Sequence, residues 1–325
     1  MRTLLAIAAL ALLMGAPNAR AERVVLISVD GLRPDAITPE TAPNIVALRA
    51  TGTAAREALA ALPPITLPSH ASMLTGLTVQ RHGLLLDFDL PGTIPQPTVF
   101  DFAHDAGLRT AFFASKTKMS FLAHPDASET IDIDPDPTAI VARLLPLIAT
   151  DGPDLIFLHL RDPDSTGHRS GWMSPEYLAA VTRMDALIGQ VADAITADAE
   201  RPTYLIITAD HGGRGHGHLL NKPVNRHIPW IAIGPGIPAG AELPDTVSTT
   251  DTTPTVLWLL GVPIPDGLSG RARTELRETP PVGTGNTAPS VPPVGPPCFL
   301  VALPLLVLFC FAAARVPRAW YTRSA

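Results

Sequence analysis

Cysteine is nearly absent from this chain of 325 residues. The two that occur, Cys298 and Cys310, both lie close to the C-terminal end, so the chain before them has no disulfide and no thiol chemistry. Lysine is also scarce, with three residues in all, and no internal repeat is present. Hydrophobic residues make up 46% of the chain, which is ample for the core of one large domain.

Positive charge is in short supply over most of the chain. Once the five arginines of the two ends are set aside, 19 basic residues stand against 30 acidic ones, a net charge of about −11. A protein that binds a nucleic acid polymer has the opposite balance, so that class is excluded. An anionic substrate would have to be attracted locally, most simply by bound metal.

The N-terminal end is typical of a secretory signal peptide. Residues 1–21 begin with a basic residue, continue with an apolar run from Leu4 to Met14, and end in Ala19-Arg20-Ala21, a small-x-small cleavage pattern. The apolar run is short for a transmembrane anchor. We therefore expect export, with a mature chain that begins near Glu22.

The C-terminal end is typical of a membrane tether. Residues 279–297 are rich in Pro, Gly, Thr and Val and predict a linker, while residues 298–314 are all apolar and predict a transmembrane helix. Residues 315–325 carry three arginines and no acidic residue, so the positive-inside rule places this tail in the cytoplasm. The domain of residues 22–278 would then lie outside the cytoplasm, in the periplasm or at the cell surface. A sorting signal that is removed by processing is the alternative for this end.

Polar and acidic residues follow three buried strands. The runs 23–29, 154–160 and 204–208 are continuously apolar or β-branched, as central parallel strands are, and each is followed by acidic residues: Asp30, then Asp164, then Asp210. His168 and His211 lie close to the second and third of these acids. Carboxylates and imidazoles together are ligands for a divalent cation, although Asp30 taken alone is equally a turn or helix cap.

Two further segments offer polar side chains. Prolines around Thr66 predict an extended loop before a helix that starts near Pro68, and Thr66 and Ser69 are either helix caps or groups that face an anion. Lys116 follows a short strand over 109–114, where it either reaches a substrate phosphate or lies in a solvated turn. His159, inside the strand 154–160, is expected to be a satisfied core histidine.

Helical patterns alternate with these strands. The clearest is a helix over about 174–199, which carries an apolar stripe and opens with Ser174-Pro175. Shorter helices are expected over 43–49, 98–107, 138–150 and 251–260, and a further strand over 228–233. The alternation predicts a doubly wound α/β domain with a mostly parallel sheet, in which ligands bind at the carboxyl ends of the strands.

The ordered set of polar segments resembles the alkaline phosphatase superfamily, and within it the type I phosphodiesterase/nucleotide pyrophosphatase branch. The matching segments are 29–31 (Val-Asp-Gly), 66–70 (Thr-Leu-Pro-Ser-His), 74–76 (Leu-Thr-Gly), 81–83 (Arg-His-Gly), 163–168 (Pro-Asp-Ser-Thr-Gly-His) and 208–212 (Thr-Ala-Asp-His-Gly). The resemblance covers roughly residues 23–271 and implies a metal-dependent hydrolase of phosphate esters, acting on a phosphodiester, a pyrophosphate or a monoester.

The resemblance also implies two divalent metal ions, with Zn²⁺ expected and Mn²⁺ as the alternative. One ion would be held by Asp30, Asp210, His211 and the nucleophile Thr66, which would form a phospho-threonine intermediate. The other would be held by Asp164, His168 and one more histidine. Gly31, Ser69, Lys116 and main-chain N–H groups are expected to contact the phosphate oxygens.

The chain departs from its branch at two points. Nucleotide pyrophosphatases have asparagine where Ser69 stands, and their third histidine lies in a late Gly-Thr-His-Gly segment that reads Asp-Gly-Leu-Ser-Gly over 266–270 here. The third histidine must therefore be His218, His216 or His227. Spacing in short relatives favours them in that order.

Three other functions remain as alternatives. The same intermediate serves a transferase that moves a phospho-headgroup to a glycan or lipid. A sulfatase-like hydrolase shares the fold, but sulfatases resemble Cys/Ser-x-Pro-Ser-Arg at the nucleophile, which Thr66 and His70 do not match. A catalytically inactive binding protein is the third. The expected partner is a small-molecule, lipid or glycan phosphate ester.

Overall fold

The computed structural model describes residues 22–277. The expected signal peptide, linker, transmembrane helix and basic tail lie outside these residues. Within residues 22–277, no helix has the length and apolar character needed to cross a membrane.

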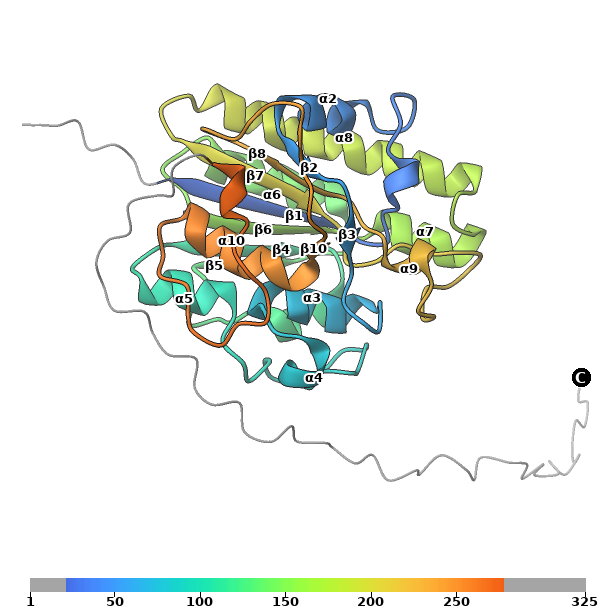
Figure 1. The fold of residues 1–325 in the computed structure, drawn as a ribbon, viewed down its shortest axis with the longest axis horizontal. Helices are drawn as coiled ribbons and strands as arrows, with labels where there is room; N and C mark the ends of the chain where they lie inside the picture. The colour runs from blue at the N-terminus through green and yellow to red at the C-terminus, as the bar shows by residue number, and fades with distance from the viewer. Residues whose placement is uncertain (1–21, 278–325) are drawn as a thin grey trace, which may run out of the picture.

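An eight-stranded sheet forms the centre of the fold, in the order β5-β4-β6-β1-β7-β8-β2-β9 (Figure 1). Its strands are β1 (Arg23–Val29), β2 (Thr53–Ala55), β4 (Thr110–Ala114), β5 (Thr130–Ile133), β6 (Leu155–Leu160), β7 (Thr203–Thr208), β8 (Trp230–Ile233) and β9 (Ala241–Leu243). The short strands β3 (Ala58–Leu59) and β10 (Val247–Ser248) pair separately.

The predicted mostly parallel α/β sheet is confirmed. Strand β1 lies between β6 and β7 and pairs with both in parallel, and all of its residues are buried because helices cover both of its faces. The difference from the prediction is β8, which runs antiparallel to β7 and to β2. A sheet with an antiparallel strand beside a parallel centre is common in α/β domains.

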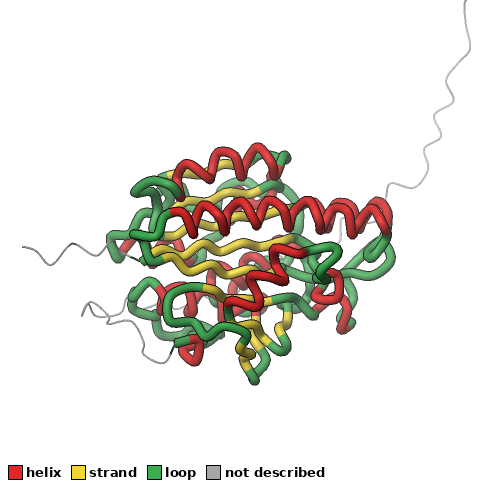
Figure 2. Tube along the Cα trace, turned by 90° about the horizontal axis from the view of Figure 1, so that it is seen from above, coloured by secondary structure: helices red, strands yellow, loops and turns green. Residues whose placement is uncertain are grey.

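Helices pack on both faces of the sheet, as Figures 1 and 2 show. On one face lie α2 (Pro43–Thr51), α6 (Pro137–Ile148) and the long α8 (Pro175–Ala197); on the other lie α3 (Thr66–Thr75), α5 (Val99–Asp105) and α10 (Thr252–Leu259). The shorter α4 (Val79–His82), α7 (Asp162–Ser170) and α9 (Pro223–Arg226) lie in the connections. Helix α8 begins where expected, because Pro175 starts it and the Ser174 hydroxyl accepts a hydrogen bond from the Tyr177 N–H.

The segments that carry Thr66 and Asp164 are both helical. Thr66 is the first residue of α3, so its side chain lies at the helix N-terminus rather than in an extended loop. Asp164 and His168 lie in α7, where their spacing of four residues places them on the same helix face. Strand order and helix placement thus bring four chain segments to the carboxyl edge of the sheet.

Candidate metal centre

Four neighbouring strands deliver polar side chains to one edge of the sheet. Asp30 directly follows β1, Asp210 and His211 follow β7, and α7 with Asp164 follows β6. Lys116 follows β4, the next strand beyond β6. Because these strands are parallel, their carboxyl ends meet at the same edge, as the sequence predicted.

Two groups of ligand-type side chains converge there. In the first group, Nε2 of His211 lies 3.5 Å from Oδ1 of Asp30, 3.3 Å from Oδ2 of Asp210 and 3.4 Å from Oγ1 of Thr66. All four side chains are buried. These are the residues that the family resemblance implies for one metal ion.

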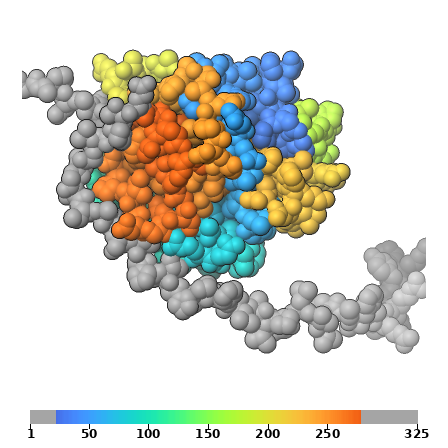
Figure 3. Space-filling model, in the orientation of Figure 1, coloured from blue at the N-terminus to red at the C-terminus, as the bar shows by residue number. Residues whose placement is uncertain are grey.

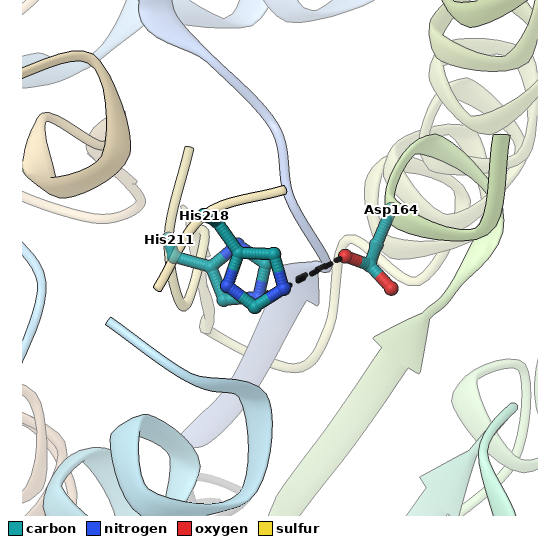
Figure 4. A group of neighbouring side chains, drawn as sticks. All are labelled: Asp164, His211 and His218. Carbon is teal, nitrogen blue, oxygen red and sulfur yellow. Dashed lines mark ion pairs between the residues drawn. The ribbon is translucent and has the colours of Figure 1, made fainter. Parts of the chain in front are cut away.

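The second group contains Asp164, His168 and His218. Nε2 of His168 lies 3.1 Å from Nε2 of His218 and 3.3 Å from Oδ1 of Asp164, and Nε2 of His218 lies 3.6 Å from that same oxygen. Figure 4 shows Asp164 facing the rings of His211 and His218, which stack at a centroid distance of 3.6 Å. The two groups are therefore adjacent, with Asp164 Oδ1 only 3.9 Å from Nε2 of His211.

The structure distinguishes the three histidines that the sequence left open. His218 is buried, and it faces Asp164 and His168. His216 is exposed and binds the main chain, with Nδ1 donating to the carbonyl oxygen of His168 at 3.0 Å. His227 lies elsewhere, with Nε2 3.4 Å from a carboxylate oxygen of Glu57.

Hydrogen bonds to the main chain fix the tautomers of the three histidines that line the two groups. Nδ1 of His211 bonds to the carbonyl oxygen of Gly212 at 2.8 Å, that of His168 to His216 at 2.9 Å and that of His218 to Pro64 at 2.7 Å. A carbonyl only accepts, so each Nδ1 carries a proton, and in the neutral form of each ring Nε2 presents a lone pair to the site.

The facing carboxylate oxygens also lack donors. Oδ1 of Asp30, Oδ1 of Asp164 and Oδ2 of Asp210 are buried and have no hydrogen-bond partner. Lone pairs on nitrogen and oxygen thus face one another across 3.1 to 3.6 Å in both groups. Such an arrangement repels itself unless a proton or a metal ion lies between the atoms, and imidazole nitrogens beside carboxylate oxygens are donors that fit divalent metal ions.

The carboxylates also influence one another electrostatically. Burial and the neighbouring Asp30 carboxylate raise the pKa of Asp210 well above its ordinary value. Burial also acts to raise the pKa of Asp30, but the Lys116 ammonium and the His159 hydrogen bond outweigh it and hold that pKa well below its ordinary value. Burial lowers the pKa of His211 to about 3, which keeps its imidazole neutral, the form that binds a metal.

Lys116 lies inside this site and not in a solvated turn. Its Nζ is 2.7 Å from Oδ2 of Asp30 and 2.5 Å from Oδ2 of Asp164, on the carboxylate oxygens that do not face the histidines of the two ligand groups. The side chain therefore carries one positive charge to the boundary between the two ligand groups. A cation there compensates only part of the charge of three buried carboxylates.

Two predicted phosphate contacts have other partners. The Ser69 hydroxyl donates to the carbonyl oxygen of Asp210 at 2.7 Å, and the Gly31 N–H donates to Oδ1 of Asp210 at 3.1 Å. Gly31 has φ of +70°, and a Cβ there would lie 3.0 Å from the Asp164 backbone, so no larger residue fits. Both donors therefore hold Asp210 in place.

Two histidines of the core support the site, and sequence reasoning assigned neither this role. Nε2 of His159 lies 2.9 Å from Oδ2 of Asp30, and its Nδ1 accepts from the Ser115 N–H at 3.3 Å. His70 bonds to the carbonyl oxygen of Thr66 and to the Ser28 hydroxyl, each at 2.8 Å. The parallel register pairs His159 with Ser28, two residues before Asp30, and that pairing was the available signal.

Comparison with known proteins identifies the family. The model of the type I phosphodiesterase / nucleotide pyrophosphatase family matches residues 24–93 and 86–216. Human ectonucleotide pyrophosphatase/phosphodiesterase family member 7 is 27% identical over 226 residues, 58% of this chain and 47% of that protein. Human arylsulfatase K is 33% identical over 100 residues, 29% of this chain and 19% of that protein. The chain thus spans less than half the length of these two relatives.

Solved structures share the fold at low sequence identity. Murine ectonucleotide pyrophosphatase / phosphodiesterase 5, inactive and in complex with AMP, superposes with a TM-score of 0.63 at 15% identity, covering 74% of this chain and 96% of that one. Phosphonate monoester hydrolase from Silicibacter pomeroyi gives 0.65 at 17% identity, covering 78% and 76%. With the family model matching more than half of its length, the chain belongs to the type I phosphodiesterase/nucleotide pyrophosphatase family of the alkaline phosphatase superfamily.

Proposed function

We propose that this protein hydrolyses phosphate esters, phosphodiesters first among them, with Thr66 as the nucleophile and two divalent metal ions as cofactors. The observation that carries the proposal is the pair of adjacent ligand groups whose lone pairs face one another, with the Thr66 hydroxyl in one of them. Zn²⁺ suits the mixed imidazole and carboxylate donors, and Mn²⁺ is the alternative.

Each ligand group would hold one of the two ions. Asp30, Asp210 and His211 would hold one ion beside Thr66, and Asp164, His168 and His218 would hold the other. When bound, the two ions lower the pKa of a coordinated hydroxyl and stabilise charge on the attacking and leaving oxygens.

Thr66 would attack phosphorus in line with the leaving group. A bond forms between Oγ1 and phosphorus while the bond from phosphorus to the leaving oxygen breaks, and the proton of the threonine hydroxyl passes through solvent to the alcohol that departs. Water then attacks the phospho-threonine, its oxygen stays with the phosphate product, and its proton restores the Thr66 hydroxyl.

Lys116 is the proposed phosphate contact from the protein. It is the cation that reaches the boundary between the two ligand groups, and its long, unbranched side chain allows Nζ to change partners when an anion arrives. The ammonium is charged at neutral pH because Asp30 and Asp164 raise its pKa and outweigh the effect of burial.

The test is hydrolysis of bis(4-nitrophenyl) phosphate in the presence of Zn²⁺. Wild-type protein should release nitrophenol, Thr66→Ala should lose at least about 1000-fold in kcat, and Thr66→Ser should retain part of the activity. Quenched wild-type reactions should contain a phosphopeptide that includes Thr66. Full activity of Thr66→Ala would contradict the proposal. Faster turnover of a nitrophenyl monoester than of the diester would show that monoesters are the preferred substrates.

Sulfate esters are a second candidate class, favoured by the local similarity to arylsulfatase K. The segment Thr66-Leu67-Pro68-Ser69-His70 lacks the cysteine or serine nucleophile of that pattern. Nitrophenyl sulfate assayed beside the phosphodiester decides between them. Product recovered on an added glycan or lipid acceptor, instead of on water, would indicate a transferase.

We also propose that the protein is exported and tethered to the membrane through residues 298–314. The sequence patterns of residues 1–21 and 298–325 support this, and both segments lie outside the described residues. Fractionation of expressing cells, with the N-terminus of the mature chain determined by mass spectrometry, tests it. A soluble cytoplasmic chain that retains residue 1 would contradict it.

A further inference from the structure

Large hydrophobic side chains are exposed almost entirely at one place in the described part of the chain. Seven such residues are exposed, and six of them lie in three segments around Thr66. We call these six the apolar rim: Leu62, Leu85, Leu86, Phe88, Leu219 and Leu220, each between 40% and 66% exposed. The seventh, Ile131, lies on the edge strand β5.

Contacts bind all three segments to the nucleophile's segment. Leu62 precedes Thr66 by four residues. The N–H of Leu67, the neighbour of Thr66, donates to Oδ1 of Asp87 at 2.9 Å, so the loop with Leu86 and Phe88 lies against the start of α3. Nδ1 of His218 bonds to the carbonyl oxygen of Pro64 at 2.7 Å, which holds the loop with Leu219 beside residue 64.

The figures show these segments close together. In Figure 1 the loop after α4 and the loop before α9 both lie at the end of the molecule where α3 begins. In Figure 3 the blue, cyan and gold surfaces that contain them adjoin on one face. Exposed apolar patches of this kind mark binding sites when they are concentrated, whereas single exposed hydrophobic residues do not.

The chemistry of the rim favours an aliphatic ligand. Five of its six residues are leucine, and aliphatic side chains bind methylene chains by removing apolar surface from water. A nucleobase is held by stacking on aromatic rings, and Phe88 is the one aromatic residue of the rim. Asp87, which lies between Leu86 and Phe88 in the sequence, is already paired, since Lys118 Nζ lies 2.8 Å from its Oδ1.

We infer that the apolar rim binds the aliphatic tail of an amphiphilic phosphate ester, so that the substrate of the Thr66 site carries a long alkyl or acyl chain. The inference rests on the proposed function for the phosphate end of that substrate. Docking of the rim on a bilayer surface is the competing use, and the strongly acidic balance of the domain gives no attraction to anionic lipids.

The experiment compares methyl 4-nitrophenyl phosphate with dodecyl 4-nitrophenyl phosphate, both below the critical micelle concentration, on the full-length protein with Zn²⁺. We expect kcat/KM to be about 100-fold higher for the dodecyl ester, because the rim can cover several methylene groups. Equal values for the two esters would overturn the inference, as would a preference that appears only above the micelle concentration, which would assign the rim to docking.

Two rim variants and one control locate the effect. The variant that combines Leu85→Ser, Leu86→Ser and Phe88→Ser, and the one that combines Leu219→Ser and Leu220→Ser, should each reduce the dodecyl-to-methyl ratio by about 10-fold or more. Ile131→Ser removes an exposed apolar side chain elsewhere and should leave the ratio at the wild-type value. A wild-type ratio in both rim variants would overturn the role of the rim.

If the protein does not hydrolyse phosphate esters, the outcome can be told apart from failure of the tail-site inference. In that case neither ester is hydrolysed, and calorimetric titration with dodecyl phosphate against methyl phosphate replaces the rate measurement. Tighter binding of dodecyl phosphate that is lost in the rim variants would still support the tail site. Equal binding of the two phosphates would overturn it.

Discussion

At the amino ends of β1 and β7, the sheet buries charges that are fully provided with partners, whereas at the carboxyl ends it buries charges that are not. Arg23 donates to three main-chain carbonyl oxygens, of Ile148, Thr150 and Pro153, at 2.8 to 3.1 Å. Arg201 pairs with Asp154 and also donates to the carbonyl oxygen of Gly152 at 2.6 Å.

The carboxyl edge holds three buried carboxylates with one lysine among them, and three of their oxygens accept no hydrogen bond. Both edges belong to the same sheet. The difference therefore reflects the roles of the buried charges. Paired buried charges stabilise the fold, whereas unpaired buried charges are costly and persist where a ligand compensates them.

The largest expected effect is a loss of activity when a carboxylate at the carboxyl edge is replaced. Asp210→Asn and Asp164→Asn should each lower phosphodiester hydrolysis by at least about 1000-fold, because each removes a charged donor for a metal ion. In the presence of a chelator, Asp210→Asn should be as stable as the wild type or more stable, since the raised pKa of Asp210 means that its charged form costs stability at neutral pH.

Nitrophenol release measures the activity of these variants, and thermal unfolding in EDTA measures their stability without metal. An Asp210→Asn protein that is inactive and also less stable than the wild type in EDTA would assign the carboxylate a structural role. That outcome would remove the contrast between the edges.

The next effect concerns the amino ends of the strands, where we expect a loss of stability without a loss of activity. Arg201→Met should lower the free energy of unfolding by about 3 kcal/mol, because it leaves the Asp154 carboxylate without its charged partner. Activity per folded molecule should stay at the wild-type level. Arg183→Met is the matched control: Arg183 is exposed and pairs with Asp162 at 3.5 Å, so its loss should change stability by less than about 0.5 kcal/mol. Urea unfolding of the three proteins decides the point.

The choice among histidines gives a smaller contrast within the carboxyl edge. His218→Ala should weaken binding of the second metal ion by about 100-fold or more, since it removes a ligand atom. His216→Ala should weaken it by about 10-fold, because His216 acts only by holding His168 through the main chain. Metal titration with mass-spectrometric metal counting compares them. Equal losses of metal affinity in the two variants would show that His216 is also a ligand.

The smallest effect concerns a buried histidine away from both edges. Nε2 of His82 lies 2.9 Å from the Ser72 hydroxyl and Nδ1 accepts from the Leu84 N–H at 3.1 Å, so the ring is neutral when folded. Burial lowers the pKa of His82 to about 4. The lowered folded-state pKa means that stability is present above the unfolded-state pKa near 6.5 and declines as the pH falls toward 4.

This contribution should amount to about 2 kcal/mol between pH 7 and pH 5. Urea unfolding of wild type and His82→Gln across that range isolates it, because the other groups titrate alike in both proteins. Parallel stability curves for the two proteins would show that His82 does not titrate on unfolding. Ser72→Ala, which removes one hydrogen bond and keeps the imidazole, should preserve most of the pH dependence.

Much of the sheet and of the site was predictable from local patterns. The buried strands β1, β6 and β7 are continuous apolar runs, and each acid was predicted at a strand exit before any pairing was known. Helix α8 was predicted from its apolar stripe and its Ser-Pro start. The antiparallel direction of β8 was not predicted, because a short apolar run has the same pattern in either direction.

The details that the sequence did not decide all depend on contacts between distant segments. Lys116 was left open between a phosphate contact and a solvated turn, and only the neighbouring positions of β4, β6 and β1 place its ammonium against Asp30 and Asp164. The donors of Ser69 and Gly31 were expected to face a phosphate, and both bind Asp210 across more than a hundred residues of sequence.

By itself, the sequence determined which chemical groups this protein brings to its site, because carboxylates and imidazoles stand at the exits of strands whose apolar runs bury them. The sequence ranked three candidate histidines, and the tertiary structure places His218 beside Asp164 and His168. A short turn, in which the Arg214 N–H bonds to the carbonyl oxygen of Gly217 at 3.0 Å, leaves His216 exposed and directs His218 to Asp164. Spacing ranked His218 first, but the path of a glycine-rich loop also depends on what it packs against, and spacing alone does not fix that path.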